Sequence, residues 1–113
     1  MTFKNTLLNF IDELLAQFEF RNKIVYRRLI HIHHLIKNKL DDIELTNICE
    51  QWLVIPEITY KIDKRDYKIF KNTPYETDAE WIWEESTSID KSTIWIWIDA
   101  LVIELKRCSS INP

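Results

Sequence analysis

The sequence contains no glycine, although average usage would place about eight glycines in a chain of 113 residues. Glycine adopts positive φ angles without strain and lets a backbone approach a ligand closely. Dinucleotide fingerprints, phosphate-binding loops and nucleophile elbows therefore need it at fixed positions. Its absence excludes these enzyme classes in their usual forms. It also favours helices, because tight hairpin turns prefer glycine.

Cysteines and long apolar runs are scarce as well. Cys49 and Cys108 lie far apart, which predicts two reduced thiols rather than a disulfide framework. The first residues lack the cationic start and apolar stretch of a signal peptide. The longest apolar segment, residues 94 to 105, is interrupted by Asp99 and Glu104 and is shorter than the roughly 18 residues of a membrane span. We therefore expect a cytoplasmic protein with no membrane partner.

The residues that are present suit one globular domain. Hydrophobic residues make up 46% of the chain and charged residues 29%, and five Trp, four Tyr and five Phe supply bulky side chains for a core. A chain of this length can bury enough apolar surface to fold without disulfides. We expect a single domain over residues 1 to 108, followed by a flexible tail over residues 109 to 113.

Apolar residues repeat at three- and four-residue steps through the first half of the chain, which predicts three helices. The first covers about residues 3 to 19 and the second about 22 to 39. The third begins after Asp41 or Asp42 and is ended by Pro56. Side chains able to cap the first and third helices are Thr2, Asp41 and Asp42.

The middle of the chain has a strand-like pattern. Ile58, Tyr60 and Ile62 alternate with polar residues, and a second short run, Tyr67 to Phe70, follows a polar turn. This pattern predicts a small antiparallel β-hairpin near residues 57 to 71.

Residues 79 to 98 fit two structures. Thr77 and Glu80 have capping-box spacing, which indicates a short helix to Glu85, and residues 94 to 105 carry a helical apolar stripe. The aromatic and β-branched content instead suits a β-hairpin over the whole segment. We favour helices. The expected fold class is mainly α, a compact bundle of about four to five helices, with an α+β fold as the alternative if residues 79 to 98 form a hairpin.

Charge is polarised along the chain, whose net charge is −3 at pH 7. Residues 21 to 39 hold six Lys or Arg and three His but no acid, whereas residues 72 to 90 hold six acids and no base. The net negative charge does not favour non-specific nucleic-acid binding as the main activity. The basic and acidic segments could form ion pairs with one another within the molecule, or each could bind a partner.

The acidic segment resembles a protein-binding surface, because Trp and Tyr anchor many interfaces and surrounding charges steer the partner. Its composition suits a basic partner protein, such as a nuclease or a toxin. In the alternative interpretation, Trp81 or Trp83 fills the core and the acids are only solvated. The candidate partner-binding residues are Tyr75, Glu76, Asp78, Glu80, Trp81, Trp83, Glu84 and Glu85.

The basic segment is an alternative site, where a cationic helix could contact RNA or DNA phosphates. On a helix, His31 and His34 share a face while His33 points elsewhere, so at most two of the three could hold one metal ion. We therefore expect no metal and no cofactor. The candidate nucleic-acid residues are Arg27, Arg28, His31, His33 and His34.

Arg28 and His33 are separated by four residues, and this spacing resembles the signature of HEPN-type helical ribonucleases. The resemblance covers six residues, and Leu29 stands where the family usually has a small polar residue. It implies that Arg28 would stabilise phosphate charge and that His33 would act as general acid or base.

Together these features predict a binding protein without enzymatic activity. The first hypothesis is a small stoichiometric inhibitor or neutraliser, as immunity proteins, antitoxins and phage-encoded inhibitors are. The alternatives are a helical nucleic-acid-binding or ribonuclease-like protein, and a structural subunit of a larger complex or homo-oligomer with an interface on an apolar helix such as residues 94 to 105.

Overall fold

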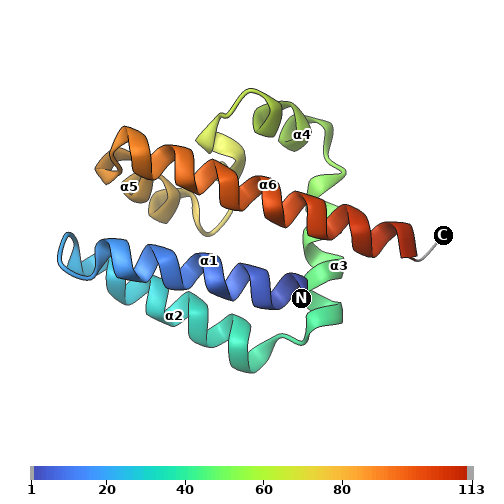
Figure 1. Cartoon of the computed structure of the whole chain (residues 1–113), viewed down its shortest axis with the longest axis horizontal. Coiled ribbons are helices and arrows are strands. Elements are labelled where there is room, and N and C mark those ends of the chain that lie inside the picture. Colours follow the sequence, from blue (N-terminus) through green and yellow to red (C-terminus); the bar gives the residue numbers. More distant parts are fainter. Residues whose placement is uncertain (1, 112–113) are drawn as a thin grey trace.

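The computed structural model describes residues 2 to 111, with side chains described as far as Arg107. These residues form six α-helices and one short 3-10 helix, without a strand (Figure 1). The predicted mainly α class is confirmed. The elements are α1 (Phe3–Phe18), α2 (Lys23–Lys39), α3 (Asp42–Leu53), α4 (Pro56–Asp63), η1 (Tyr67–Phe70), α5 (Glu76–Glu85) and α6 (Ser88–Ile111).

Side-chain caps set the starts of the first three helices. Thr2 accepts a hydrogen bond from a first-turn amide of α1, and Asp41 accepts one from the amide of Glu44 in α3, as predicted. Asn22 accepts bonds from two amides at the start of α2, which separates α2 from α1. The first two helices therefore form an antiparallel pair joined by a tight turn.

The hairpin predicted near residues 57 to 71 is wrong, because this segment forms α4 and η1. Pro56 does not end the preceding helix, which already stops at Leu53. It occupies the first turn of α4, where its missing N–H costs no hydrogen bond. Ile58 and Ile62 are four residues apart, so the same alternation also places both on the buried side of a helix.

The two described residues with positive φ, Arg65 at 55° and Asn72 at 66°, stand where glycine is usual. Asn tolerates this left-handed conformation better than most residues, whereas Arg does not. The guanidinium of Arg65 donates to Asp99 of α6 at 2.6 and 2.7 Å and lies 5.2 Å from the ring centroid of Trp95. The side chain of Arg65 therefore connects the turn after α4 to α6.

The helical alternative for residues 79 to 98 is confirmed by α5 and α6. The predicted capping box is not used, because α5 begins at Glu76, before Thr77, and Tyr75 makes no side-chain cap. A reciprocal cap lies instead before α6. The Thr87 amide donates to Asp90 Oδ2 at 3.0 Å, and the Asp90 amide donates to Thr87 Oγ1 at 3.1 Å.

Helix α6 reaches Ile111, so residues 109 to 111 of the expected tail are helical, while Asn112 and Pro113 lie outside the described residues. None of the helices in the described part of the chain combines the length and apolar character that a bilayer span requires.

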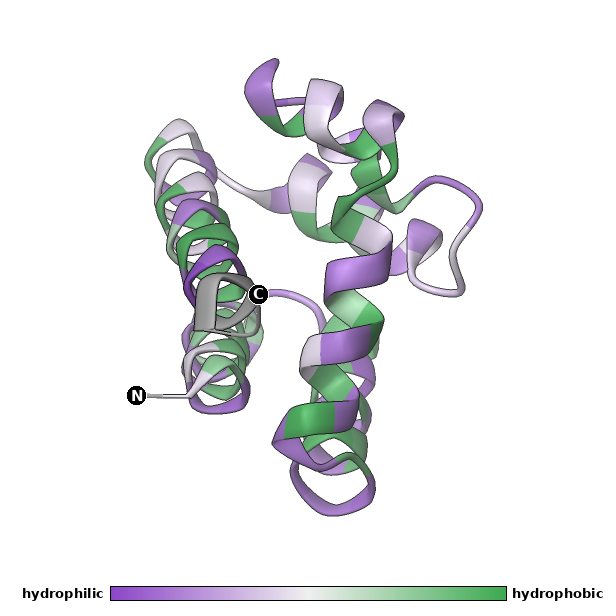
Figure 2. Ribbon diagram, turned by 90° about the vertical axis from the view of Figure 1, so that its right-hand side faces the viewer, coloured by the Kyte–Doolittle hydropathy of each residue, from purple (hydrophilic) through white to green (hydrophobic). Residues whose placement is uncertain are grey.

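The main core lies where α1 meets α2, α3 and α6, and apolar residues recur along these helices between hydrophilic ones (Figure 2). A smaller cluster joins α4 and η1 to α6. The buried core residues include Phe18, Val25, Leu29, Leu45, Ile94 and Leu105 in the main cluster and Ile58, Ile62 and Ile69 in the smaller one. This packing leaves the outer faces of α2, α5 and α6 available to solvent.

Candidate interaction surfaces

An ion pair between Arg28 and Asp78 joins α2 to α5. Arg28 Nε donates to Asp78 Oδ1 at 3.0 Å, and Nη2 donates to Oδ2 at 2.9 Å, which is a bidentate arrangement. Asp78 is only 6% exposed. The hydrogen bond and charge of Asp78 raise the pKa of Arg28 above its ordinary value. These two residues belong to the two sites predicted from the sequence, and here they bind one another.

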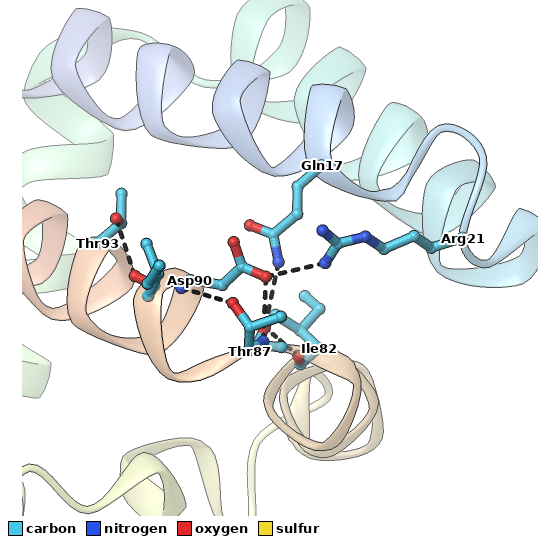
Figure 3. A network of polar contacts seen from close by, with 8 residues as sticks. Gln17, Arg21, Ile82, Thr87, Asp90 and Thr93 are labelled. Carbon is cyan, nitrogen blue, oxygen red and sulfur yellow. Dashed lines mark hydrogen bonds and ion pairs between the residues drawn. The ribbon is translucent and has the colours of Figure 1, made fainter.

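A second ion pair ties the turn after α1 to the start of α6, with Arg21 Nη1 at 2.9 Å from Asp90 Oδ2 (Figure 3). The hydrogen bond from Arg21, followed by that from the Thr87 amide, lowers the pKa of Asp90 below its ordinary value. The basic and acidic segments therefore form ion pairs with one another at two places. This was one of the two interpretations that the sequence left open.

Further side-chain hydrogen bonds complete this junction. Gln17 Nε2 donates to Ser86 Oγ at 3.2 Å, and the Ser86 hydroxyl donates to the Ile82 carbonyl at 2.6 Å. Asn22 Nδ2 donates to Glu85 Oε1 at 2.8 Å. Glu85, a predicted partner-binding residue, is thus engaged by the end of the α1–α2 turn.

Trp83, which was assigned to the binding surface, packs inside instead. Its ring stacks on Tyr67 with centroids 5.4 Å apart and meets Trp95 edge-on at 6.1 Å. The ammonium of Lys91 lies 4.9 Å from the Trp83 ring centroid. Trp83 is therefore half-buried, with its ring held by contacts within the fold.

Three of the remaining candidates, Glu80, Trp81 and Glu84, define what we call the α5 outer face, whereas Tyr75 is exposed just before the helix, near Arg28. Trp81 is 37% exposed and lies between the two exposed glutamates, which are four residues apart on the helix. The side chains of Glu80, Trp81 and Glu84 have no hydrogen bond, ion pair or ring contact with the described residues. Glu76 is half-buried and, with Ala79 and Glu80, lines a groove of about 220 Å³ against η1.

The α2 outer face is cationic and carries no acid. Four of the five predicted nucleic-acid residues, Arg27, Arg28, His31 and His34, are exposed, although the guanidinium of Arg28 is bound by Asp78. His34 shares a hydrogen bond of 3.0 Å with the amide of Asn38. The exposed residues of this face are Lys23, Ile24, Arg27, Ile30, His31, His34, Lys37 and Asn38.

Arg28 and His33 do not converge on one site. The two positions are five apart in the chain, which corresponds to about 140° around a helix. His33 Nε2 lies 3.1 Å from Asp12 of α1, on the other side of α2 from the Arg28–Asp78 pair. The geometry that the ribonuclease resemblance implies, with both side chains at one phosphate, is not present.

No group of three or more potential metal ligands occurs within the described residues. Burial raises the pKa of the Cys49 thiol to about 11, so this thiol stays protonated at neutral pH and is a poor nucleophile. A groove of about 350 Å³ lies between α3, α4 and α6 and is lined mainly by apolar side chains, including Leu53, Ile62 and Val102.

The lowered pKa of Asp90 predicts an acid-dependent loss of stability. Because the folded-state pKa lies below the unfolded one, the contribution of Asp90 is complete at neutral pH and is lost as the pH falls through the folded value. Asp90→Asn should reduce stability at about pH 7 by about 0.2 to 1 kcal/mol, the range of exposed ion pairs, and by less at about pH 3. Urea unfolding at both pH values measures this, with Glu84→Gln as the control. An equal deficit of Asp90→Asn at both pH values would contradict the assignment.

No protein-family model matches the chain, and neither a curated protein nor a solved structure shows significant similarity to it. Its interactions must therefore be inferred from its own surfaces, the acidic α5 outer face and the cationic α2 outer face.

Proposed function

We propose that the chain is a small binding protein without enzymatic activity that inhibits or neutralises a basic partner protein in the cytoplasm. Immunity proteins, antitoxins and phage-encoded inhibitors act by stoichiometric binding of this kind. The observation that carries the proposal is the partly exposed Trp81 beside Glu80 and Glu84, three side chains that make no hydrogen bond, ion pair or ring contact with the described residues.

The chemistry of this face fits a cationic protein. A tryptophan that is partly exposed in the free chain can bury its remaining surface in a partner, and tryptophan is among the residues that most often dominate binding energy. The two carboxylates form no ion pair with the described residues, so a lysine or arginine of the partner would not have to displace one. Their field would also accelerate encounter with a positively charged surface.

The contacts that hold α5 in place favour binding as well. Asp78 is bound by Arg28, and Trp83 stacks on Tyr67 and meets Trp95 edge-on. The outer face is therefore held on a fixed helix, and a partner would meet it with little loss of conformational entropy.

Affinity capture from cells of the source organism tests the proposal, with the wild-type chain compared with Trp81→Ala and with Glu80→Lys combined with Glu84→Lys. We expect each variant to recover the captured partner at least about tenfold less well, because it removes an anchor or reverses the charge of the face. Glu13→Lys, at an exposed acid of α1, is the control for charge and should capture normally.

Binding to a purified captured protein should be stoichiometric and should weaken as salt is raised. Folded variants that capture the same proteins in the same amounts as the wild type would exclude the α5 outer face as the binding site.

A second candidate function is nucleic-acid binding through the α2 outer face. Lys23, Arg27 and Lys37 are exposed on it without an ion pair to the described residues, and no carboxylate lies among them. Cations spaced along one helix can contact successive phosphates of a strand. This face uses Arg27, His31 and His34 of the predicted site but not Arg28 or His33, which are held by carboxylates.

Fluorescence anisotropy with a labelled single-stranded RNA tests this candidate. Three phosphate contacts would give a salt dependence with a slope of about −2 in a plot of log K against log salt. Arg27→Glu combined with Lys37→Glu should abolish binding, whereas Lys71→Glu, an exposed cation next to η1, should not. An absence of RNA binding by the wild-type chain at low salt would eliminate this function.

A further inference from the structure

Helix α6 exposes a regular stripe of isoleucines that neither proposed function uses. Ile89, Ile96 and Ile103 are 79%, 67% and 56% exposed and lie seven residues apart. Seven residues are close to two helical turns, so the three side chains line up along one side of the helix. Thr93 and Ala100, which are small, lie between them on the same side.

The opposite side of α6 is apolar too. Ile94, Trp95 and Leu105 are buried against the rest of the bundle. A helix that is apolar on both sides is usually buried on both sides, whereas a surface helix carries polar residues outward. Within the part of the chain that the structure describes, the fold covers the inner side of α6 and leaves the isoleucine stripe open to solvent.

We propose that the isoleucine stripe of α6 packs against the same stripe of a second copy of the chain, with the two helices antiparallel and Ile96 at the two-fold axis. Ile89 and Ile103 are equally distant from Ile96, so each Ile89 then meets Ile103 of the second copy. A self-complementary patch of this kind is what a two-fold dimer requires. The small side chains of Thr93 and Ala100 let the two helices approach closely.

Charge complementarity selects the antiparallel direction. Asp99 lies at the edge of the stripe, paired with Arg65, and a parallel pair would place the two copies of Asp99 side by side. The antiparallel pair places Asp99 opposite Thr93 instead. It also brings the exposed Lys106 of one copy towards the other copy's start of α6, where Glu85 ends the preceding helix. Opposite charges at the ends of an interface favour this register.

The size of the stripe sets the strength of the contact. Residues 89 to 103 span about 21 Å of helix, and three isoleucines with their small neighbours cover less than the about 800 Å² per partner of a standard stable interface. We therefore expect a dimer that forms as the concentration rises, not an obligate one. The stripe shares no residue with the α5 outer face, so the two proposals fail or succeed separately.

Sedimentation velocity from about 5 to about 500 micromolar measures the association. We expect the wild-type chain to shift from monomer to dimer over this range and Ile96→Glu to remain monomeric. Ile43→Glu, at an isoleucine of α3 that is 73% exposed, is the matched control and should dimerise normally. If Ile96→Glu does not fold, Ile96→Ser removes the same apolar contact without a charge and should weaken the dimer at least about tenfold.

Cysteine cross-linking tests the direction, in a background that carries Cys49→Ala and Cys108→Ser. On oxidation, Ile96→Cys should form a disulfide-linked dimer with itself, since two copies of this position meet at the axis. Ile89→Cys should not cross-link alone but should do so when mixed with Ile103→Cys.

Self-cross-linking of Ile89→Cys would show a parallel pair and overturn the proposed geometry. The proposal would be overturned if the wild-type chain stays monomeric at every concentration. It would also be overturned if the chain stays monomeric and a different protein binds over Ile96. A dimer that is unaffected at Ile96 would overturn it as well.

Discussion

The ion pair between Arg28 and Asp78 is the contact on which the arrangement of the surfaces depends. A carboxylate that is 6% exposed is costly to bury without a partner, and the bidentate guanidinium satisfies both of its oxygens. This pair fixes which side of α5 faces α2. Once Asp78 points inward, Ile82 follows on the same side one turn later, while Glu80 and Glu84 must point outward.

The same logic explains how the opposite charges of the chain are divided. Arg21 and Arg28 are used inside the molecule, against Asp90 and Asp78, where they hold α5 and α6 to the first two helices. Among the other charges of these two segments, Glu80 and Glu84 lie on the outer side of α5, and Lys23, Arg27 and Lys37 lie on the outer side of α2, without an ion pair to the described residues. The internal pairs thus position the elements, and the unpaired charges are left for other molecules.

Much of the fold could be predicted from the sequence because local signals were strong. Thr2, Asp41 and the apolar spacing define α1 to α3 to within a residue or two. The prediction of a hairpin near residues 57 to 71 was wrong. Apolar residues at every second position include a pair four residues apart, and this spacing also fits one side of a helix. The cap of α6 could have been found, since Thr87 and Asp90 have capping-box spacing.

The sequence predicted the candidate site only as a segment of the chain, without showing which of its side chains face outward. Which of its side chains face outward depends on a contact between Arg28 and Asp78, which are 50 residues apart in the chain. Local patterns carry no information about such a contact, so Asp78, Trp83 and Glu85 were assigned to a surface although all three are engaged within the fold.

Hydrogen exchange of the backbone amides in the wild-type chain and in Arg28→Met tests the role of this ion pair most directly. The substitution keeps the apolar stem of the side chain and removes only the charge and its hydrogen bonds. We expect amides of α5 to lose at least about tenfold in protection, while those of α1 and the rest of α2 keep theirs. Unchanged protection of α5 would contradict the conclusion that this pair positions the helix and its outer face.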